Sequence, residues 1–183
     1  MPLLDFVEIA VRAREVRQAA GYTRGPVSAR TLMEKCYPDV LVTGQNLPAN
    51  LMELVEVGRH GRAIYYNRRH NTAAHRVGII HGLAHLLYDL PASLSCPLEF
   101  QSGATVDVRE RRADLFAGEV LMPLVELDAK FKGLLFPRDP VDKQAFDDDV
   151  DHAASTFKVP PGFVRFRLFD LAKLRSSNFY VRK

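Results

Sequence analysis

The chain has 183 residues, of which 47% are hydrophobic and 26% charged, and its formal net charge is +3. This length and apolar content suit one domain with a buried core, and the mild, interspersed charge gives no argument for a nucleic-acid-binding protein. Because the sequence shows no long apolar run and no signal-peptide pattern, we expect a cytoplasmic protein and no membrane association.

The N-terminal part of the sequence predicts two helices and a short strand. Apolar residues recur at helical spacing over Leu3–Ala20, and Gly21 follows as a helix terminator. A second, shorter helix is expected within Pro26–Cys36, where Ser28 can cap the first turn. The brief apolar run Val40–Val42 predicts a strand.

Two β-rich runs then predict a hairpin. Leu51–Val57 and Arg62–Tyr66 are rich in β-branched and aromatic residues, and the four residues between them begin and end with glycine. We expect this hairpin to belong to a small sheet.

The next helix carries a histidine pair. Apolar residues at helical spacing predict a helix over Asn71–Asp89, with Asn71 as its cap and Pro91 soon after its end. His81 and His85 lie one helical turn apart on the same side, and two imidazoles in that geometry can share a zinc ion. Two unrelated helix histidines bonded to backbone or solvent would give the same spacing.

A second helix, expected over Glu110–Pro123, supplies carboxylates. A catalytic zinc site takes three protein ligands and an open fourth position, and His81, His85 and Glu110 would supply that set. Asp114 lies one turn after Glu110 and could accept a hydrogen bond from the outward nitrogen of one ligand histidine. Each carboxylate alone would also suit the surface of an amphipathic helix.

Two further segments follow the two motif helices. Pro91–Asp107 is polar and contains prolines and a glycine, so we expect a loop between the two motif helices. Leu124–Pro140 contains short apolar runs, interrupted by Gly133, Pro137 and Pro140. We expect four of its apolar side chains to cover the core: Phe131, Leu134, Leu135 and Phe136.

The C-terminal part predicts two further helices, Val150–Phe157 and Phe163–Leu174, joined by a turn. This order is similar to a helix–turn–helix, but its apolar residues are typical of packing, so DNA binding through it is not favoured. We expect residues 1–140 to form the main domain and residues 141–183 a helical segment packed on it.

Several of these motifs together resemble the ImmA/IrrE family of zinc metallopeptidases, which belong with the gluzincins. The matching parts are Ala63–Asn67, the run into His81-x-x-x-His85, and Glu110-x-x-Ala113-Asp114-x-Phe116-Ala117 ending in Leu121-Met122-Pro123. The resemblance covers about residues 25 to 125. It implies an α+β, zincin-like domain with a small sheet packed on the HxxxH helix. It also implies one zinc ion with His81, His85 and Glu110 as its ligands. Asp114 is then the residue that accepts a hydrogen bond from a ligand histidine without binding the metal.

One position departs from the family pattern HExxH, whose glutamate is the general base. Here that position is Gly82, and loss of a general base typically lowers a rate by roughly 10²–10⁴. Glycine inside a helix costs about 1 kcal/mol against alanine, so helix formation does not explain it, whereas close packing of another backbone would. Three explanations stay open: a natural member that binds without cutting, a deliberately disabled protein, or a base from elsewhere. The candidates for such a base are His75, Tyr88, Asp89 and Asp107.

The sequence therefore supports two functional hypotheses. The first is a metallopeptidase-like protein that acts on a cytoplasmic helix–turn–helix repressor, with impaired hydrolysis that Gly82→Glu should improve. The second is a non-catalytic module, with a zinc-stabilised or even metal-free fold, that holds a helix–turn–helix regulator or a toxin or antitoxin partner. Direct DNA binding through residues 150–175 is a weaker third hypothesis, with steep salt dependence as its signature.

Overall fold

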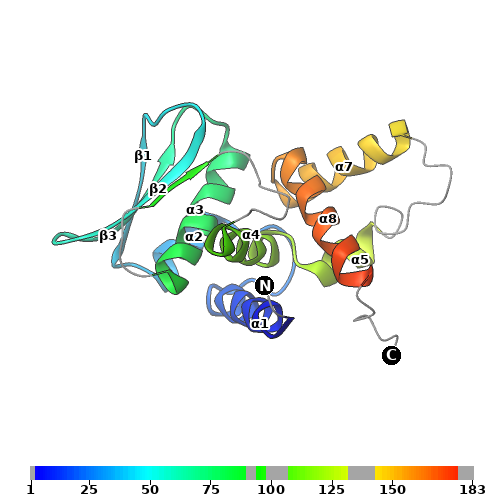
Figure 1. Ribbon diagram of the computed structural model, residues 1–183, viewed down its shortest axis with the longest axis horizontal. Helices are drawn as coiled ribbons and strands as arrows, with labels where there is room; N and C mark the ends of the chain where they lie inside the picture. Colours follow the sequence, from blue (N-terminus) through cyan, green and yellow to red (C-terminus); the bar gives the residue numbers. More distant parts are fainter. Residues whose placement is uncertain (1–2, 90–93, 98–106, 132–142, 177–183) are drawn as a thin grey trace.

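The computed structural model describes residues 3–89, 94–97, 107–131 and 143–176. A twisted sheet lies on one side, and helices α3, α4 and α1 follow one another beside it (Figure 1). Helices α5, α7 and α8 lie beyond α4 in this view (Figure 1). The predicted α+β architecture with a small sheet against the histidine helix is confirmed. Among the described residues, the helices are all too short or too polar to span a bilayer.

The sheet has the strand order β1-β3-β2-β4. Strands β2 (Leu51–Gly58) and β3 (Gly61–Asn67) form the predicted hairpin, whose last pair joins its two terminal glycines. Gly61 adopts a φ of +110°, which a side chain would disfavour. Strand β1 (Val40–Gln45) runs parallel to β3 at one edge, so the predicted short strand is present and longer than expected.

Strand β4 (Leu94–Pro97) forms the other edge and corrects one prediction. The sequence predicts a loop throughout Pro91–Asp107, but residues 94–97 pair antiparallel with β2. A four-residue strand that ends in proline has no alternation long enough to read. Its strand conformation depends on the neighbouring strand rather than on its own sequence.

Helix α3 (Thr72–Tyr88) lies between the sheet and α4 (Val108–Leu121). The Asn71 side chain accepts a hydrogen bond from the Ala74 amide at 2.9 Å, so the predicted cap is confirmed. Helix α4 begins earlier than predicted because the Asp107 side chain caps it by accepting from the Arg109 amide at 2.9 Å.

Helices α1 (Leu3–Ala19) and α2 (Ala29–Cys36) complete the domain core. Helix α1 packs on α4, and α2 packs on α3. Ser28 caps α2 as predicted, and the left-handed Gly21 follows α1. Fully buried apolar side chains of α2, β3, α3 and α4 belong to this core: Leu32, Met33, Ile64, Ile80, Leu83, Phe116 and Leu121.

The C-terminal helices are α5 (Leu124–Lys130), α7 (Lys143–Phe157) and α8 (Pro161–Ser176). Helix α7 begins at Lys143, before the predicted Val150, and includes the acidic run Asp147–Asp149. Phe131 is buried as expected, whereas Leu134–Phe136 and the expected boundary at residue 140 lie outside the described residues.

Two arginines tie these helices to the rest of the fold. The Arg76 guanidinium on α3 donates to the carbonyl oxygens of Val27, Phe157 and Lys158. Arg167 on α8 is 1% exposed and pairs with the buried Glu119 of α4. A buried and paired Arg167 is unsuited to contact DNA phosphates. The prediction of DNA binding is otherwise untested.

Candidate metal centre

Two buried histidines project from the middle of α3 toward α4. His81 and His85 are each 2% exposed, and their ring centroids lie 4.9 Å apart. The helix places both rings on one side, because residues four apart are neighbours on an α-helix. The predicted convergence of the two imidazoles is therefore present.

A different carboxylate holds the Nδ1 atom of each histidine. His81 Nδ1 lies 2.6 Å from Glu53 Oε1 on β2, and His85 Nδ1 lies 2.7 Å from Asp89 Oδ2 at the end of α3. Arg112 of α4 in turn contacts Asp89 Oδ1 at 3.2 Å. A carboxylate that accepts from Nδ1–H fixes the tautomer in which the Nε2 lone pair is available to a metal.

Glu110 faces the Nε2 atoms of both histidines. Its Oε1 lies 3.5 Å from His85 Nε2, and its Oε2 lies 3.7 Å from His81 Nε2. Zinc bonds of about 2.0–2.2 Å in a tetrahedral shell place neighbouring ligand atoms about 3.3–3.6 Å apart. His85 Nε2 is also buried without a hydrogen-bond partner among the described residues. These observations fit a cation held between His81, His85 and Glu110.

A second grouping of donors is present as well. Glu53, His81 and His85 each offer one ligand atom, and these atoms lie within 4.8 Å of one another. However, the 2.6 Å between Glu53 Oε1 and His81 Nδ1 is a hydrogen-bond distance. It is shorter than the separation of about 3.3 Å expected of two ligands on one zinc ion. This contact suits an orienting role for Glu53, and Glu110 stays the third ligand that the family motif predicts.

Asp114 contacts a different histidine nitrogen from the one that the sequence predicts. The sequence places Asp114 behind a ligand histidine, at its outward nitrogen, but Glu53 and Asp89 occupy both Nδ1 positions. Asp114 Oδ1 instead lies 3.3 Å from His81 Nε2, the nitrogen that also faces Glu110. Sequence reasoning missed Glu53. Because side chains alternate along a strand, Glu53 faces the same side of β2 as the buried Val55, and a charged residue on the buried face of a strand indicates a specific partner there.

Burial perturbs the ionisation of the centre. Burial is the main reason that the pKa of Glu110 is raised to about 7; a charge on His81 opposes this rise, and the nearby carboxylates of Glu53 and Asp114 contribute to it. Burial lowers the pKa of His85, and a charge on His81 lowers it as well. Both shifts favour the neutral forms, so a cation that binds here displaces a proton from Glu110 near neutral pH.

Gly82 faces the sheet at very short range. A Cβ atom at this position would lie 2.9 Å from Ile64 Cγ2 and 3.1 Å from Val55 Cγ2. The reason for glycine is thus close packing of strand side chains, not of a backbone as expected from the sequence. The first carbon of a glutamate would already collide with these groups, so the expected rescue by Gly82→Glu has no room in this packing.

Two of the four alternative bases have other partners. Asp89 holds His85 and contacts Arg112, and Asp107 caps α4. The His75 ring lies 4.7 Å from the Tyr66 ring, centroid to centroid. Burial raises the pKa of Tyr88 to about 12, so this phenol stays protonated at neutral pH. Asp89 and Asp107 are thus unsuited to act as a relocated base, and for His75 and Tyr88 this role stays a prediction.

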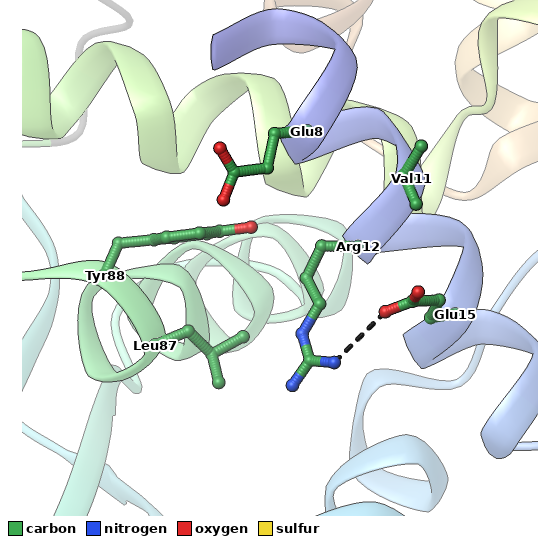
Figure 2. A pocket seen from close by; sticks show the side chains of 6 residues that line it. All are labelled: Glu8, Val11, Arg12, Glu15, Leu87 and Tyr88. Carbon is green, nitrogen blue, oxygen red and sulfur yellow. Dashed lines mark hydrogen bonds and ion pairs between the residues drawn. The ribbon is translucent and has the colours of Figure 1, made fainter. Parts of the chain in front are cut away.

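Tyr88 also lines a hollow of about 280 Å³ between α1 and α3 (Figure 2). Its other lining residues are Glu8, Val11, Arg12, Glu15 and Leu87. Arg12 and Glu15 form an exposed ion pair at 3.1 Å along one side of the hollow (Figure 2). The lining holds neither histidine of the metal centre, so the hollow is a separate feature.

The sequence comparisons identify the family of the chain. No curated protein matches the chain. Residues 37–169 match the Peptidase_M78 family, described as an IrrE N-terminal-like domain. The match spans the histidine helix, α4 and most of the C-terminal helices, and so extends further than the motifs alone. The chain therefore belongs to the Peptidase_M78 family of ImmA/IrrE metallopeptidase-like proteins.

Proposed function

We propose that this protein is a zinc-binding ImmA/IrrE domain that acts on a cytoplasmic helix–turn–helix repressor, with strongly impaired peptide hydrolysis. His81, His85 and Glu110 hold the zinc ion in this proposal. Two imidazoles and a carboxylate are a donor set that suits zinc. Family membership and the convergence of these side chains support the metal site, and the repressor follows from the resemblance to ImmA/IrrE proteins.

The surrounding residues organise the site rather than perform chemistry. Glu53 and Asp89 orient the two imidazoles, and Arg112 fixes Asp89 from α4. Near-complete burial of both histidines keeps bulk water from them. A bound zinc ion would supply Lewis acidity toward a peptide carbonyl or a water molecule.

The observation that carries the proposal is the packing of Gly82. The family's general base would stand here, and Ile64 and Val55 fill the space beside the helix that its side chain would enter. Without this base, hydrolysis is expected to be slower by roughly 10²–10⁴ than in a complete site.

The same packing favours a second candidate function, a module that binds its regulator without cutting it. A site whose base position is closed by apolar side chains suits retention of a partner better than turnover. In this case the zinc ion stabilises the fold and the partner leaves intact.

Two measurements test the proposal. The first is the metal content of the purified protein, compared with His81→Ala and with His60→Ala, which changes an exposed histidine of the hairpin turn. We expect one zinc ion per chain in the wild type and in His60→Ala, and loss of zinc in His81→Ala. Equal zinc in all three proteins would refute the metal site.

The second measurement concerns the partner. A helix–turn–helix repressor recovered by affinity capture would be purified and incubated with the zinc-loaded protein. Slow cleavage supports the impaired peptidase, and stable binding without cleavage supports the module. Cleavage at the rate of an ordinary metallopeptidase would refute both, as would the failure to bind any repressor.

A further inference from the structure

Asp114 lies beside the metal-facing nitrogen of His81. Its Oδ1 is 3.3 Å from His81 Nε2, within the separation of about 3.3–3.6 Å expected of neighbouring ligands in a tetrahedral zinc shell. Glu110 Oε2 lies 3.7 Å from the same nitrogen. Both carboxylates come from α4, one turn apart, and both face His81 on α3.

Other carboxylates already orient both histidines through their Nδ1 atoms. Glu53 accepts from Nδ1 of His81, and Asp89 accepts from Nδ1 of His85. A histidine that donates through Nδ1 has only its Nε2 lone pair for a metal, so a carboxylate at Nε2 shares the metal's side of the ring. Asp114 is therefore on the side of the ring where a ligand would be.

Burial and charge give the same indication. Asp114 is 4% exposed, and a buried carboxylate needs a cation or several hydrogen bonds to offset its lost hydration. The two carboxylates of α4 carry two negative charges when ionised, which one divalent cation balances. His85 Nε2, buried without a hydrogen-bond partner among the described residues, points to the same ion.

We infer that Asp114 is a fourth protein ligand, which joins His81, His85 and Glu110 in a closed four-coordinate metal site. This inference rests on the proposed zinc site and deepens it. Structural zinc sites have four protein ligands, whereas catalytic sites leave one position to water or substrate. A closed shell and the absence of a base at Gly82 then have the same consequence: the ion holds α3 to α4 and does not activate water. The inference therefore favours the binding module over the impaired peptidase.

Cobalt substitution tests the coordination number directly. The full chain is stripped of metal, loaded with Co²⁺ and titrated with azide, while the visible absorption is recorded. We expect the wild type to show the strong bands of four-coordinate cobalt, unchanged by azide. Asp114→Ala should bind Co²⁺ at least about tenfold more weakly and give bands that azide shifts, because a position is now open.

Two variants keep the test decisive. Asp114→Asn preserves the size of the side chain and should bind Co²⁺ more tightly than Asp114→Ala, with a partial response to azide. Asp148→Ala removes an exposed aspartate of α7 and should match the wild type throughout. Circular dichroism of each apo protein checks that the fold is retained.

The outcomes separate the inference from the proposal on which it rests. If azide shifts the wild-type bands and Asp114→Ala responds in the same way, Asp114 is no ligand, while the three-ligand site stands. In that event Asp114 accepts a hydrogen bond from His81 in the apo protein only. If the wild type binds no cobalt or zinc at all, both the inference and the metal site are wrong.

Discussion

The contact between Gly82 and the sheet predicts that even alanine is unfavourable at this position. Its Cβ would lie 2.9 Å from Ile64 Cγ2 and 3.1 Å from Val55 Cγ2, whereas carbon atoms pack best at about 3.5–4.0 Å. Overpacking of this kind costs about 1–3 kcal/mol, and the better helix propensity of alanine returns about 1 kcal/mol. Gly82→Ala should thus lower the free energy of unfolding by about 0–2 kcal/mol.

A double-mutant cycle isolates the contact from the propensity. Ile64→Ala removes both atoms near position 82 and costs about 2–5 kcal/mol through its cavity. In that background Gly82→Ala should stabilise by about 1 kcal/mol or more, because the helix gains propensity and the methyl enters the cavity. Ile64→Val is the matched control, since it keeps the Cγ1 and Cγ2 atoms near position 82 and should leave the effect of Gly82→Ala unchanged.

Urea denaturation of the apo proteins measures all six stabilities. The expected coupling between positions 82 and 64 is about 1–3 kcal/mol with Ile64→Ala and near zero with Ile64→Val. If Gly82→Ala stabilises the wild type by the full propensity of an ordinary helix position, the packing explanation for this glycine is wrong. The same result would remove the structural objection to a glutamate at position 82.

Three further predictions concern the support of the centre and of the fold. Glu53→Gln should weaken zinc binding about tenfold to a hundredfold in competition with a chelator, because the amide holds His81 Nδ1 less firmly than the carboxylate does; unchanged affinity would exclude this role. Arg112→Gln should weaken zinc binding by less than about tenfold, because Arg112 contacts the centre only through Asp89. Its control is Arg109→Gln, which removes an ion pair with the exposed Asp107 and should leave zinc binding unchanged. Arg76→Gln should lower the free energy of unfolding in urea by about 2–4 kcal/mol through the loss of charged hydrogen bonds to three carbonyl groups, and an equal loss in the exposed Arg69→Gln would contradict this.

Local signals were sufficient for the long elements of the fold. Helical spacing with Asn71 as a cap locates α3, and the glycine-bounded turn locates the β2–β3 hairpin. Strand β4 could not be predicted, because its conformation depends on pairing with β2. The start of α7 was placed too late because the three consecutive aspartates Asp147–Asp149 separate Phe146 from the apolar residues that begin at Val150.

The metal centre was predictable only within each helix. The spacing of His81 and His85 shows that they share a face, and the family motif adds Glu110. Glu53 reaches His81 from a strand that no spacing relates to α3, and the partner of Asp114 depends on how α4 is rotated against α3. Contacts between elements follow from packing, which neither periodicity nor a motif contains.

A second glycine of α3 allows a contrasting prediction. A Cβ atom at Gly78 would lie 3.1 Å from Glu53 Oε2 and 3.1 Å from Met52 Cγ, so it would press on the carboxylate that orients His81. Both contacts are with side-chain atoms that can move, so Gly78→Ala should change the stability of the apo protein by less than about 1 kcal/mol, with propensity opposing strain.

The displaced carboxylate, however, should weaken zinc binding by about tenfold, as in other losses of a partner behind a metal ligand. Gly82→Ala touches only apolar atoms of the sheet, so it should alter stability more than zinc affinity. Chelator competition and urea denaturation on the two variants therefore form a crossed test. If both glycines affect the two quantities in the same proportion, Glu53 does not position His81, and the sheet supports the helix only by packing.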